Sequence, residues 1–230
     1  MTARDKILGR IRQRLGREGP LEGAEAAALR ARIDGHQRGI VPNRTNIPHA
    51  AQVDLFQEKA EALAATVSRA KSLNDVPEIV SDYLTRHNLP GKIKMSPAPF
   101  LDGIPFGAMP MIEITRGAAE ASDEVSLTPA FTGIAETGTL CMASGANTPS
   151  TLNFLPENHI VVIRASQIAG TLEESWDRLR QAFGEGNMPR TVNFISGPSR
   201  TADIEQTLIM GAHGPRRLHI VIVDDGPEDT

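Results

Sequence analysis

Cysteine and aromatic residues are scarce in this sequence, and their scarcity narrows the chemistry open to it. Cys141 is the only cysteine among 230 residues, and it lies in an apolar run typical of a core thiol. One thiol excludes internal disulfide bonds. It also excludes an iron–sulfur cluster held by this chain alone through cysteine ligands, because such clusters use several thiolates. Aromatic residues make up 4% of the chain, so the core has to be aliphatic.

A basic excess and long apolar runs are also missing. The formal net charge is −4 at pH 7, which argues against a general nucleic-acid-binding protein. No apolar run reaches the roughly 18 residues of a transmembrane helix, and the first residues lack the apolar stretch of a secretory signal. We therefore expect a cytoplasmic protein without a transmembrane segment. The 40% hydrophobic and 23% charged residues are typical of a globular protein.

Residues 1–17 are strongly basic, with six Lys or Arg residues against one Asp. Apolar residues recur there at helical spacing and predict a short amphipathic helix: Ile7, Leu8, Ile11 and Leu15. Such a helix could dock on a partner or on an anionic membrane. Because the apolar stripe covers only two turns, we favour a surface helix that folds back on its own domain or frays. A mitochondrial presequence is the least favoured interpretation.

A Gly-, Pro- and Asn-rich stretch at residues 35–50 predicts an extended linker, which follows a helical segment at 24–34. This pattern divides the chain into two parts. Residues 1–50 are expected to form the N-terminal basic helix and linker, and residues 51–230 the main α/β domain.

Helix-like and strand-like segments alternate beyond residue 51. Apolar spacing predicts helices at 53–70, 76–91, 171–186 and 201–214. Short apolar, often β-branched runs predict strands at 92–96, 111–117, 138–143, 159–165, 191–196 and 218–224. Residues 122–137 are expected to form a helix or a loop. Strands separated by helices predict a mostly parallel sheet covered on both faces, that is, a three-layer α/β/α sandwich.

The loop at residues 196–205 is the first candidate site, because ligands of open α/β sheets bind where strands lead into helices. Gly197 frees the backbone, and Ser199 or Thr201 can cap the predicted helix. The exposed N–H groups would suit a phosphate or a carboxylate. Asp203, in the first helical turn, would repel a second anion. From the residues alone we favour a structural cap.

The second candidate is Glu136, in the segment GIAETGTL. A carboxylate in dry surroundings beside a strand can act as a nucleophile or a base with a raised pKa. The alternative is a turn carboxylate that accepts backbone N–H bonds, which is commoner for a lone Glu. Thr137, Gly138 and Thr139 would allow a ligand to approach the backbone closely.

Several isolated polar residues have both a functional and a structural explanation. His213 is either a ligand-facing base or a favourable residue at a helix C-terminus. Asn147, Thr148 and Asn153 either line the same opening or simply form turns. His159 is interpreted as structural, and the histidines are too scattered to predict a zinc site.

Three segments together resemble the LUD-domain family, and within it the lactate utilization C group: GIAETGTL, NFLPENHIVVIRASQI and ISGPSRTADIEQTLIMGAHGPRRLHIVIVDD. The resemblance covers roughly residues 50–225. It implies a fold similar to ribose-5-phosphate isomerase, glucosamine-6-phosphate deaminase and CoA transferases. It also implies a role with two iron–sulfur partner proteins in oxidising L-lactate to pyruvate, with the clusters on the partners.

Our leading hypothesis places a pocket between residues 133–139 and 196–205, for a small anion such as lactate or part of a cofactor. Glu136 is the expected anchor or base, and by position alone it is analogous to the loop glutamate of CoA transferases. The expected ligand-binding residues are Thr137, Gly138, Thr139, Gly197, Ser199, Thr201, Asp203 and His213. No flavin or nicotinamide motif is readable, and no metal site is predicted.

Two alternatives stay open beside the lactate hypothesis. One is a stand-alone transferase or ligase that acts on a CoA ester, a folate or a sugar phosphate. The other is an assembly or regulatory subunit without chemistry of its own, in which the basic N-terminal helix is the functional part.

Overall fold

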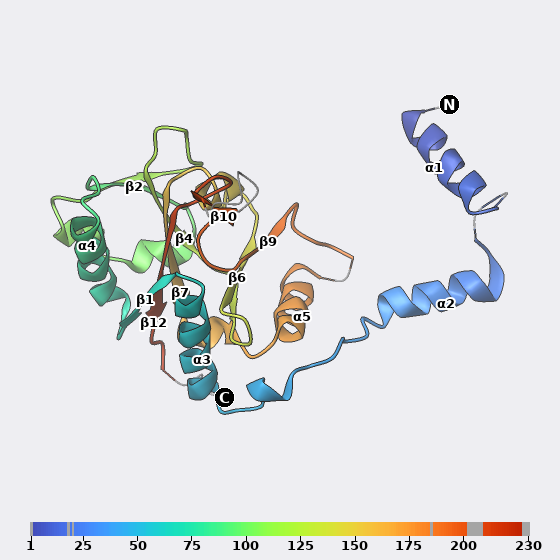
Figure 1. Cartoon of the computed structure of the whole chain (residues 1–230), viewed down its shortest axis with the longest axis horizontal. Helices are drawn as coiled ribbons and strands as arrows, with labels where there is room; N and C mark the ends of the chain where they lie inside the picture. Colours follow the sequence, from blue (N-terminus) through green and yellow to red (C-terminus); the bar gives the residue numbers. More distant parts are fainter. Residues whose placement is uncertain (1, 18, 20, 185, 202–208, 227–230) are drawn as a thin grey trace. The chain divides into compact units, whose positions relative to one another are not determined.

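The computed structural model describes every residue except 1, 18, 20, 185, 202–208 and 227–230 (Figure 1). The chain forms two units, residues 1–40 and residues 41–230. Among the helices of the described residues, none is both long enough and apolar enough to cross a bilayer.

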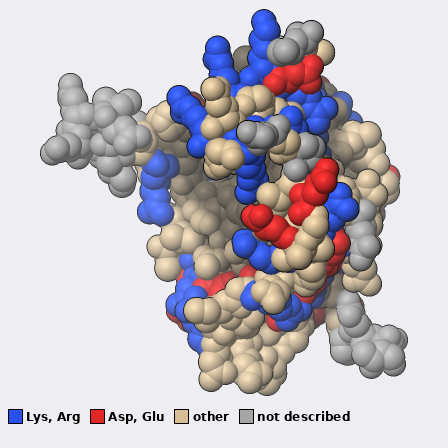
Figure 2. All heavy atoms as spheres, turned by 90° about the vertical axis from the view of Figure 1, so that its right-hand side faces the viewer, with Lys and Arg blue, Asp and Glu red and all other residues tan. Residues whose placement is uncertain are grey.

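Two helices make up the first unit, α1 (Ala3–Arg14) and α2 (Gly23–Asp34). α1 starts with a capping box: the Thr2 hydroxyl accepts the Asp5 N–H, and the Asp5 carboxylate accepts the Thr2 N–H at 2.8 Å. α1 has no buried residue, and its Ile7 is 60% exposed. Figure 2 shows Lys and Arg side chains gathered in the upper part of the face that it displays.

Six parallel strands form the central sheet of the second unit, in the order β1-β12-β7-β4-β2-β3. They are β1 (Thr66–Ala70), β2 (Lys92–Met95), β3 (Glu113–Arg116), β4 (Val125–Pro129), β7 (Asn158–Arg164) and β12 (Arg217–Val223). β7 and β12 are buried over nearly their whole length, as expected for continuous apolar runs inside a parallel sheet. The mostly parallel sheet predicted from the alternating pattern is confirmed.

Helices cover both faces of this sheet, so the predicted α/β/α architecture is confirmed (Figure 1). On one face α4 (Val76–Arg86) packs over Ile160 and Val162 of β7. On the other face α3 (His49–Ala62) packs over Val161 and Ile163, because successive side chains of a strand point to opposite sides. Short 3-10 turns complete the connections: η1 (Asn43–Thr45), η2 (Leu73–Asp75), η3 (Pro99–Gly103), η4 (Phe106–Ala108), η5 (Ser150–Asn153) and η6 (Ala165–Gln167).

A smaller mixed sheet shares the α3 face of the domain. Its order is β8-β5-β6-β9, from β5 (Thr132–Ile134), β6 (Thr139–Ala143), β8 (Ile168–Ala169) and β9 (Val192–Ile195). Leu140 of β6 belongs to the same core as α3. α5 (Leu172–Phe183) packs on this sheet and is capped by Thr171, whose hydroxyl accepts the Glu174 N–H. The Glu174 carboxylate accepts the Gly170 N–H instead of closing a capping box with Thr171.

Two stretches that join the central sheet differ from the prediction. The predicted helix at 53–70 ends at Ala62, Ala64 takes a left-handed conformation with φ of 68°, and residues 66–70 form β1 against β12. Residues 125–129, expected to be a helix or a loop, are β4 between β2 and β7. Strand pairing inside the sheet, which is not visible in local spacing, decides both conformations.

The predicted helix at 201–214 is wrong in its described parts. Arg200–Thr201 and Ile209–Met210 pair as the antiparallel strands β10 and β11. Residues 202–208, and Asp203 with them, lie outside the described residues. Thr201 is therefore the last residue of β10.

Candidate functional site

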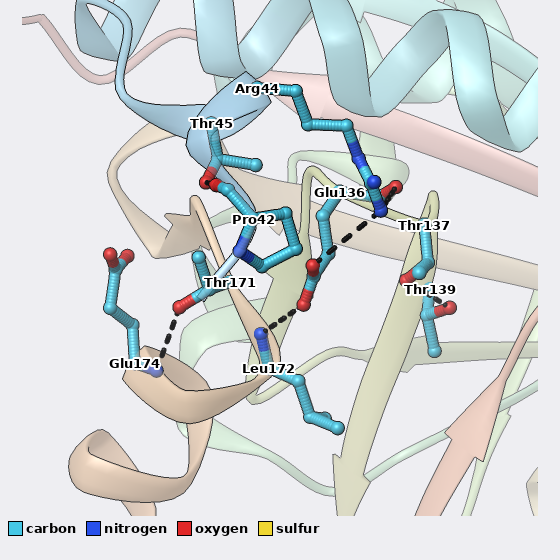
Figure 3. Close-up of polar contacts among 9 residues, drawn as sticks. All are labelled: Pro42, Arg44, Thr45, Glu136, Thr137, Thr139, Thr171, Leu172 and Glu174. Atoms are coloured by element: carbon cyan, nitrogen blue, oxygen red, sulfur yellow. Dashed lines mark hydrogen bonds and ion pairs between the residues drawn. The ribbon is translucent and has the colours of Figure 1, made fainter. Parts of the chain in front are cut away.

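Glu136 lies in the turn between β5 and β6, where its carboxylate is held by α5 and by η1 (Figure 3). Glu136 Oε1 accepts the Leu172 N–H at 2.8 Å, at the first residue of α5. Arg44 Nη2 lies 3.7 Å from Oε2, and the Glu136 side chain is only 10% exposed. A carboxylate at this end of a helix is stabilised by the free N–H groups and by the helix dipole. Glu136 therefore fixes the turn to α5, whatever further role it has.

The two loops singled out in the sequence are joined by a chain of hydroxyl groups. Thr137 Oγ1 donates to Thr139 Oγ1 at 2.8 Å, and Thr139 Oγ1 lies 2.7 Å from Ser196 Oγ. Gly138 has a φ of +65°, and a Cβ there would lie 2.3 Å from the Ala60 backbone nitrogen. Glycine is thus required at 138 by its close packing against α3.

Ser199 is bonded to the segment that carries His213. The Ser199 N–H donates to the Pro215 carbonyl at 2.8 Å, and the Gly211 N–H donates to the Ser199 carbonyl at 2.9 Å. The His213 N–H donates to Ser199 Oγ at 3.2 Å, which leaves the Ser199 hydroxyl hydrogen available to another acceptor. The backbone is therefore folded back on itself here, with both polar side chains on one loop pair.

A cavity of about 200 Å³ opens beside this loop pair. Three of the predicted residues line it, Gly197, Ser199 and His213, and so do Ser196 and His159. Glu136, Thr137, Gly138, Thr139 and Thr201 line none of the three cavities described here. The structure thus brings the loop that starts at Ser196 to a cavity, whereas the glutamate loop lines none of the three.

His159 is the unexpected member of this group. It is fully buried in β7, and Thr128 Oγ1 lies 2.7 Å from its Nε2. Its Nδ1 has no hydrogen-bond partner among the described residues. Burial lowers the pKa of His159 to about 3, so the ring is neutral at pH 7. The sequence signal that could have marked His159 is a polar residue at the start of the otherwise apolar run HIVVI.

A second cavity of about 370 Å³ adjoins the first, since Asn153 lines both. Asn147, Thr148 and Thr128 line the second cavity, so the amide and hydroxyl residues noted in the sequence do gather at one opening. The Thr128–His159 hydrogen bond connects the linings of the two cavities. We call them the paired cavities.

The described residues also bear on two further kinds of site, a metal site and a reactive thiol. Within the described residues, no group of three or more His, Cys, Asp or Glu side chains is placed to hold a metal ion. Cys141 is buried in β6, and burial raises the pKa of its thiol, so the protonated form is favoured. Cys141 therefore behaves as the core thiol expected from its apolar surroundings.

The family follows from a comparison with known sequences. The sequence model of the LUD domain matches residues 53–223, which include nearly the whole second unit. The chain belongs to the LUD domain family. The residues that line the paired cavities all lie inside this LUD domain.

Several relatives carry the name lactate utilization protein C. The protein from Shouchella clausii is 37% identical over 107 residues, 46% of either chain, and that from Bacillus subtilis is 33% identical over 93 residues, 40% of this chain and 39% of that protein. The matched part is therefore less than half of these relatives. A crystal structure of a DUF162 family protein from Deinococcus radiodurans covers 77% of this chain and 99% of its own, with a TM-score of 0.54 and 23% identity. That structure shows the same fold.

Proposed function

We propose that this LUD-domain chain works in lactate utilization, as a component of an iron–sulfur-dependent system that oxidises L-lactate to pyruvate. The observation that carries the proposal is the similarity to proteins named lactate utilization protein C, within a matching LUD domain. The single cysteine is consistent with clusters held by partner proteins. In this proposal the chain supplies a binding site and the partners supply the electron transfer.

The paired cavities are the proposed site for the small anionic ligand. Lactate carries a carboxylate and a hydroxyl, and both need hydrogen-bonding groups in a confined space. The hydroxyls of Ser196 and Ser199 and the imidazole of His213 can donate to the carboxylate. His159 can bond the ligand hydroxyl through Nδ1. With a pKa of about 3 it is a weak base, so its proposed role is orientation and not proton removal.

The first test is thermal unfolding of the purified chain with L-lactate, pyruvate, phosphate, CoA esters, folates and flavins. A ligand at 100 times its Kd stabilises the folded state by about 2.7 kcal/mol, which is a readable shift in Tm. Loss of one hydrogen-bonding group should weaken lactate binding about tenfold in Ser199→Ala and in His159→Leu. His219→Leu is the matched control, because His219 is equally buried on the opposite face of the sheet. Binding that survives both site variants would reject this site.

Glu136 is tested separately because its carboxylate already holds α5. Glu136→Gln keeps an oxygen for the Leu172 N–H and removes the charge beside Arg44. If Glu136 is the anchor or base of the reaction, lactate oxidation by the chain reconstituted with its partners should fall by a factor of about 100 or more, with Tm changed little. Normal oxidation in this variant would leave Glu136 with its structural role alone.

The same experiments separate the two alternatives. Turnover of a CoA ester, folate or sugar phosphate by the isolated chain would favour a stand-alone transferase or ligase. Unchanged lactate oxidation in all cavity variants, combined with its loss on deletion of residues 1–17, would favour an assembly subunit that works through α1.

A further inference from the structure

The largest of the three cavities lies at the carboxyl edge of the central sheet, apart from the paired cavities. Its volume is about 820 Å³. Residues that follow three neighbouring strands form its floor: Lys71 after β1, Asp224 after β12 and Ser166 after β7. The first turns of α3 form another wall, and Figure 1 shows α3 beginning at the edge where β12 ends. Ligands of parallel α/β sheets characteristically bind at this edge.

The cations of this cavity differ in how far they are already engaged. Arg69 is held by Asp54 at 2.9 Å, by Gln57 at 2.7 Å and by the Val53 carbonyl at 3.2 Å. This ion pair neutralises Asp54. Lys71 and Arg178 form no ion pair within the described part of the chain.

Arg178 is nevertheless fixed in position. Its Nη1 donates to the Ser166 carbonyl at 3.1 Å, which leaves the other N–H groups of the guanidinium for a ligand. Ser166 also binds the Asp225 carboxylate through its N–H at 3.1 Å. The remaining carboxylate in the lining, Asp224, accepts the Gly226 N–H at 3.1 Å.

His49, whose Nε2 lies 3.1 Å from the Ala165 carbonyl oxygen, and Gly226 also line the cavity. The remaining side chains of the lining are aliphatic: Ala50, Val53, Ala70, Ala165 and Ile222. A ligand for this cavity therefore needs an anionic part and an uncharged body. The volume is more than twice that of either paired cavity and lies in the upper part of the roughly 300–1,000 Å³ range of organic ligand pockets. A three-carbon acid such as lactate would leave most of it unfilled.

We infer that this carboxyl-edge cavity binds a nucleotide-sized organic phosphate, a second ligand independent of the one proposed for the paired cavities. Lys71 and Arg178 hold the phosphate, since a fixed guanidinium and an ammonium both suit phosphate oxygens. The Asp224 carboxylate accepts a hydrogen bond from a ribose hydroxyl. The flat or aliphatic remainder packs on the small apolar side chains.

The test is isothermal titration of the full chain with ADP and with coenzyme A, two phosphorylated ribosides. Saturable binding of one molecule per chain is expected for at least one of them. Lys71→Ala and Arg178→Ala should each weaken it about tenfold, because each removes a charge-assisted contact. Arg180→Ala is the matched control for Arg178, since Arg180 lies on the same helix and pairs with Asp177 outside the cavity lining. Lys59→Ala is the control for Lys71→Ala, because Lys59 pairs with Glu58 outside the cavity lining.

A steric variant keeps the test decisive if a charge variant unfolds. Ala50 is exposed in the first turn of α3 and lines the cavity, so Ala50→Phe should block the ligand without disturbing the core. The inference is overturned if neither ADP nor coenzyme A binds. It is also overturned if one of them binds and Lys71→Ala, Arg178→Ala and Ala50→Phe all leave that binding unchanged. His159→Leu should not alter ADP or coenzyme A binding, which separates this inference from the lactate proposal.

Discussion

Two buried histidines on opposite faces of one sheet have similar local chemistry and different surroundings. His159 on β7 is fully buried and His219 on β12 is 4% exposed. Each has one ring nitrogen beside a threonine hydroxyl, Thr128 at 2.7 Å and Thr66 at 2.8 Å. In each ring the other nitrogen lacks a partner among the described residues. Burial lowers both pKa values, to about 3 for His159 and about 4 for His219.

The difference lies in what covers each ring. His219 stacks on Tyr83 with ring centroids 4.5 Å apart, inside the core beneath α4. His159 lines a cavity whose other walls carry Ser196, Ser199 and His213. The unpartnered ring nitrogen of His219 thus lies inside the packed core, whereas that of His159 is the proposed ligand contact. Burial and pKa alone would not distinguish them.

The largest effect expected from the two histidines is a loss of folding stability at acidic pH. Both histidines have folded-state pKa values below the unfolded value of about 6.5, so below that pH the unfolded chain binds protons that the folded chain does not. The free energy of unfolding should fall by about 1.4 kcal/mol per pH unit for each histidine. The loss should begin near pH 6.5 and level off near pH 4 for His219 and near pH 3 for His159. Urea unfolding between about pH 6.5 and 4.5 measures this slope.

The control is the double variant His159→Gln and His219→Gln. Neither glutamine titrates, so the variant should lose less stability on acidification than the wild type, even if it is less stable at neutral pH. Equal slopes in the two proteins would show that neither histidine is neutral in the folded chain.

The threonine partners should show an intermediate effect. Thr128→Val leaves Nε2 of a fully buried histidine unpaired and should cost about 1–3 kcal/mol of folding stability. Thr66 is exposed, so water can replace its hydroxyl, and Thr66→Val should cost about 1 kcal/mol or less. Chemical denaturation of both variants at neutral pH measures the difference. Equal losses would mean that the two sites are equally dry.

Tyr83→Phe should have the smallest effect. The Tyr83 hydroxyl is buried without a partner among the described residues, and burial raises its pKa to about 12. Removing a hydroxyl that forms no hydrogen bond should change the free energy of unfolding by less than about 1 kcal/mol, while the ring keeps its stacking on His219. A loss above about 2 kcal/mol in the same unfolding experiment would reveal a hydrogen bond to this hydroxyl.

The local sequence pattern was sufficient to predict those helices and strands that have a regular apolar spacing. β7 and β12 are long apolar runs, and α4 and α5 have clear amphipathic spacing and recognisable ends, so all four were predictable. Residues 66–70 follow a helix without an obvious break, and their strand conformation depends on β12, about 150 residues later in the chain. That dependence is not readable from a window of neighbouring residues.

The candidate site was predictable only in part for the same reason. The motif around Gly197, Ser199 and His213 marked one wall of a cavity. His159 lines that cavity from β7 of the central sheet, whereas Ser196 follows β9 of the smaller sheet. Its place in the site therefore depends on how the two sheets pack and not on the spacing of residues in the sequence. The carboxyl-edge cavity was missed because the residues after β1, β7 and β12 become neighbours only through the strand order.

That strand order also has a consequence for how the chain is made. Within the described residues, β1 pairs with β12 alone, and β12 lies between β1 and β7. During synthesis β1 leaves the ribosome with no partner and keeps an unpaired edge until residues 217–223 follow. The sheet can therefore be completed only after β12 has been synthesised, and a stalled or truncated chain that lacks β12 presents the open edges of β1 and β7 to other chains. Aggregation of such nascent chains, more than instability of the finished fold, is the hazard that this topology creates.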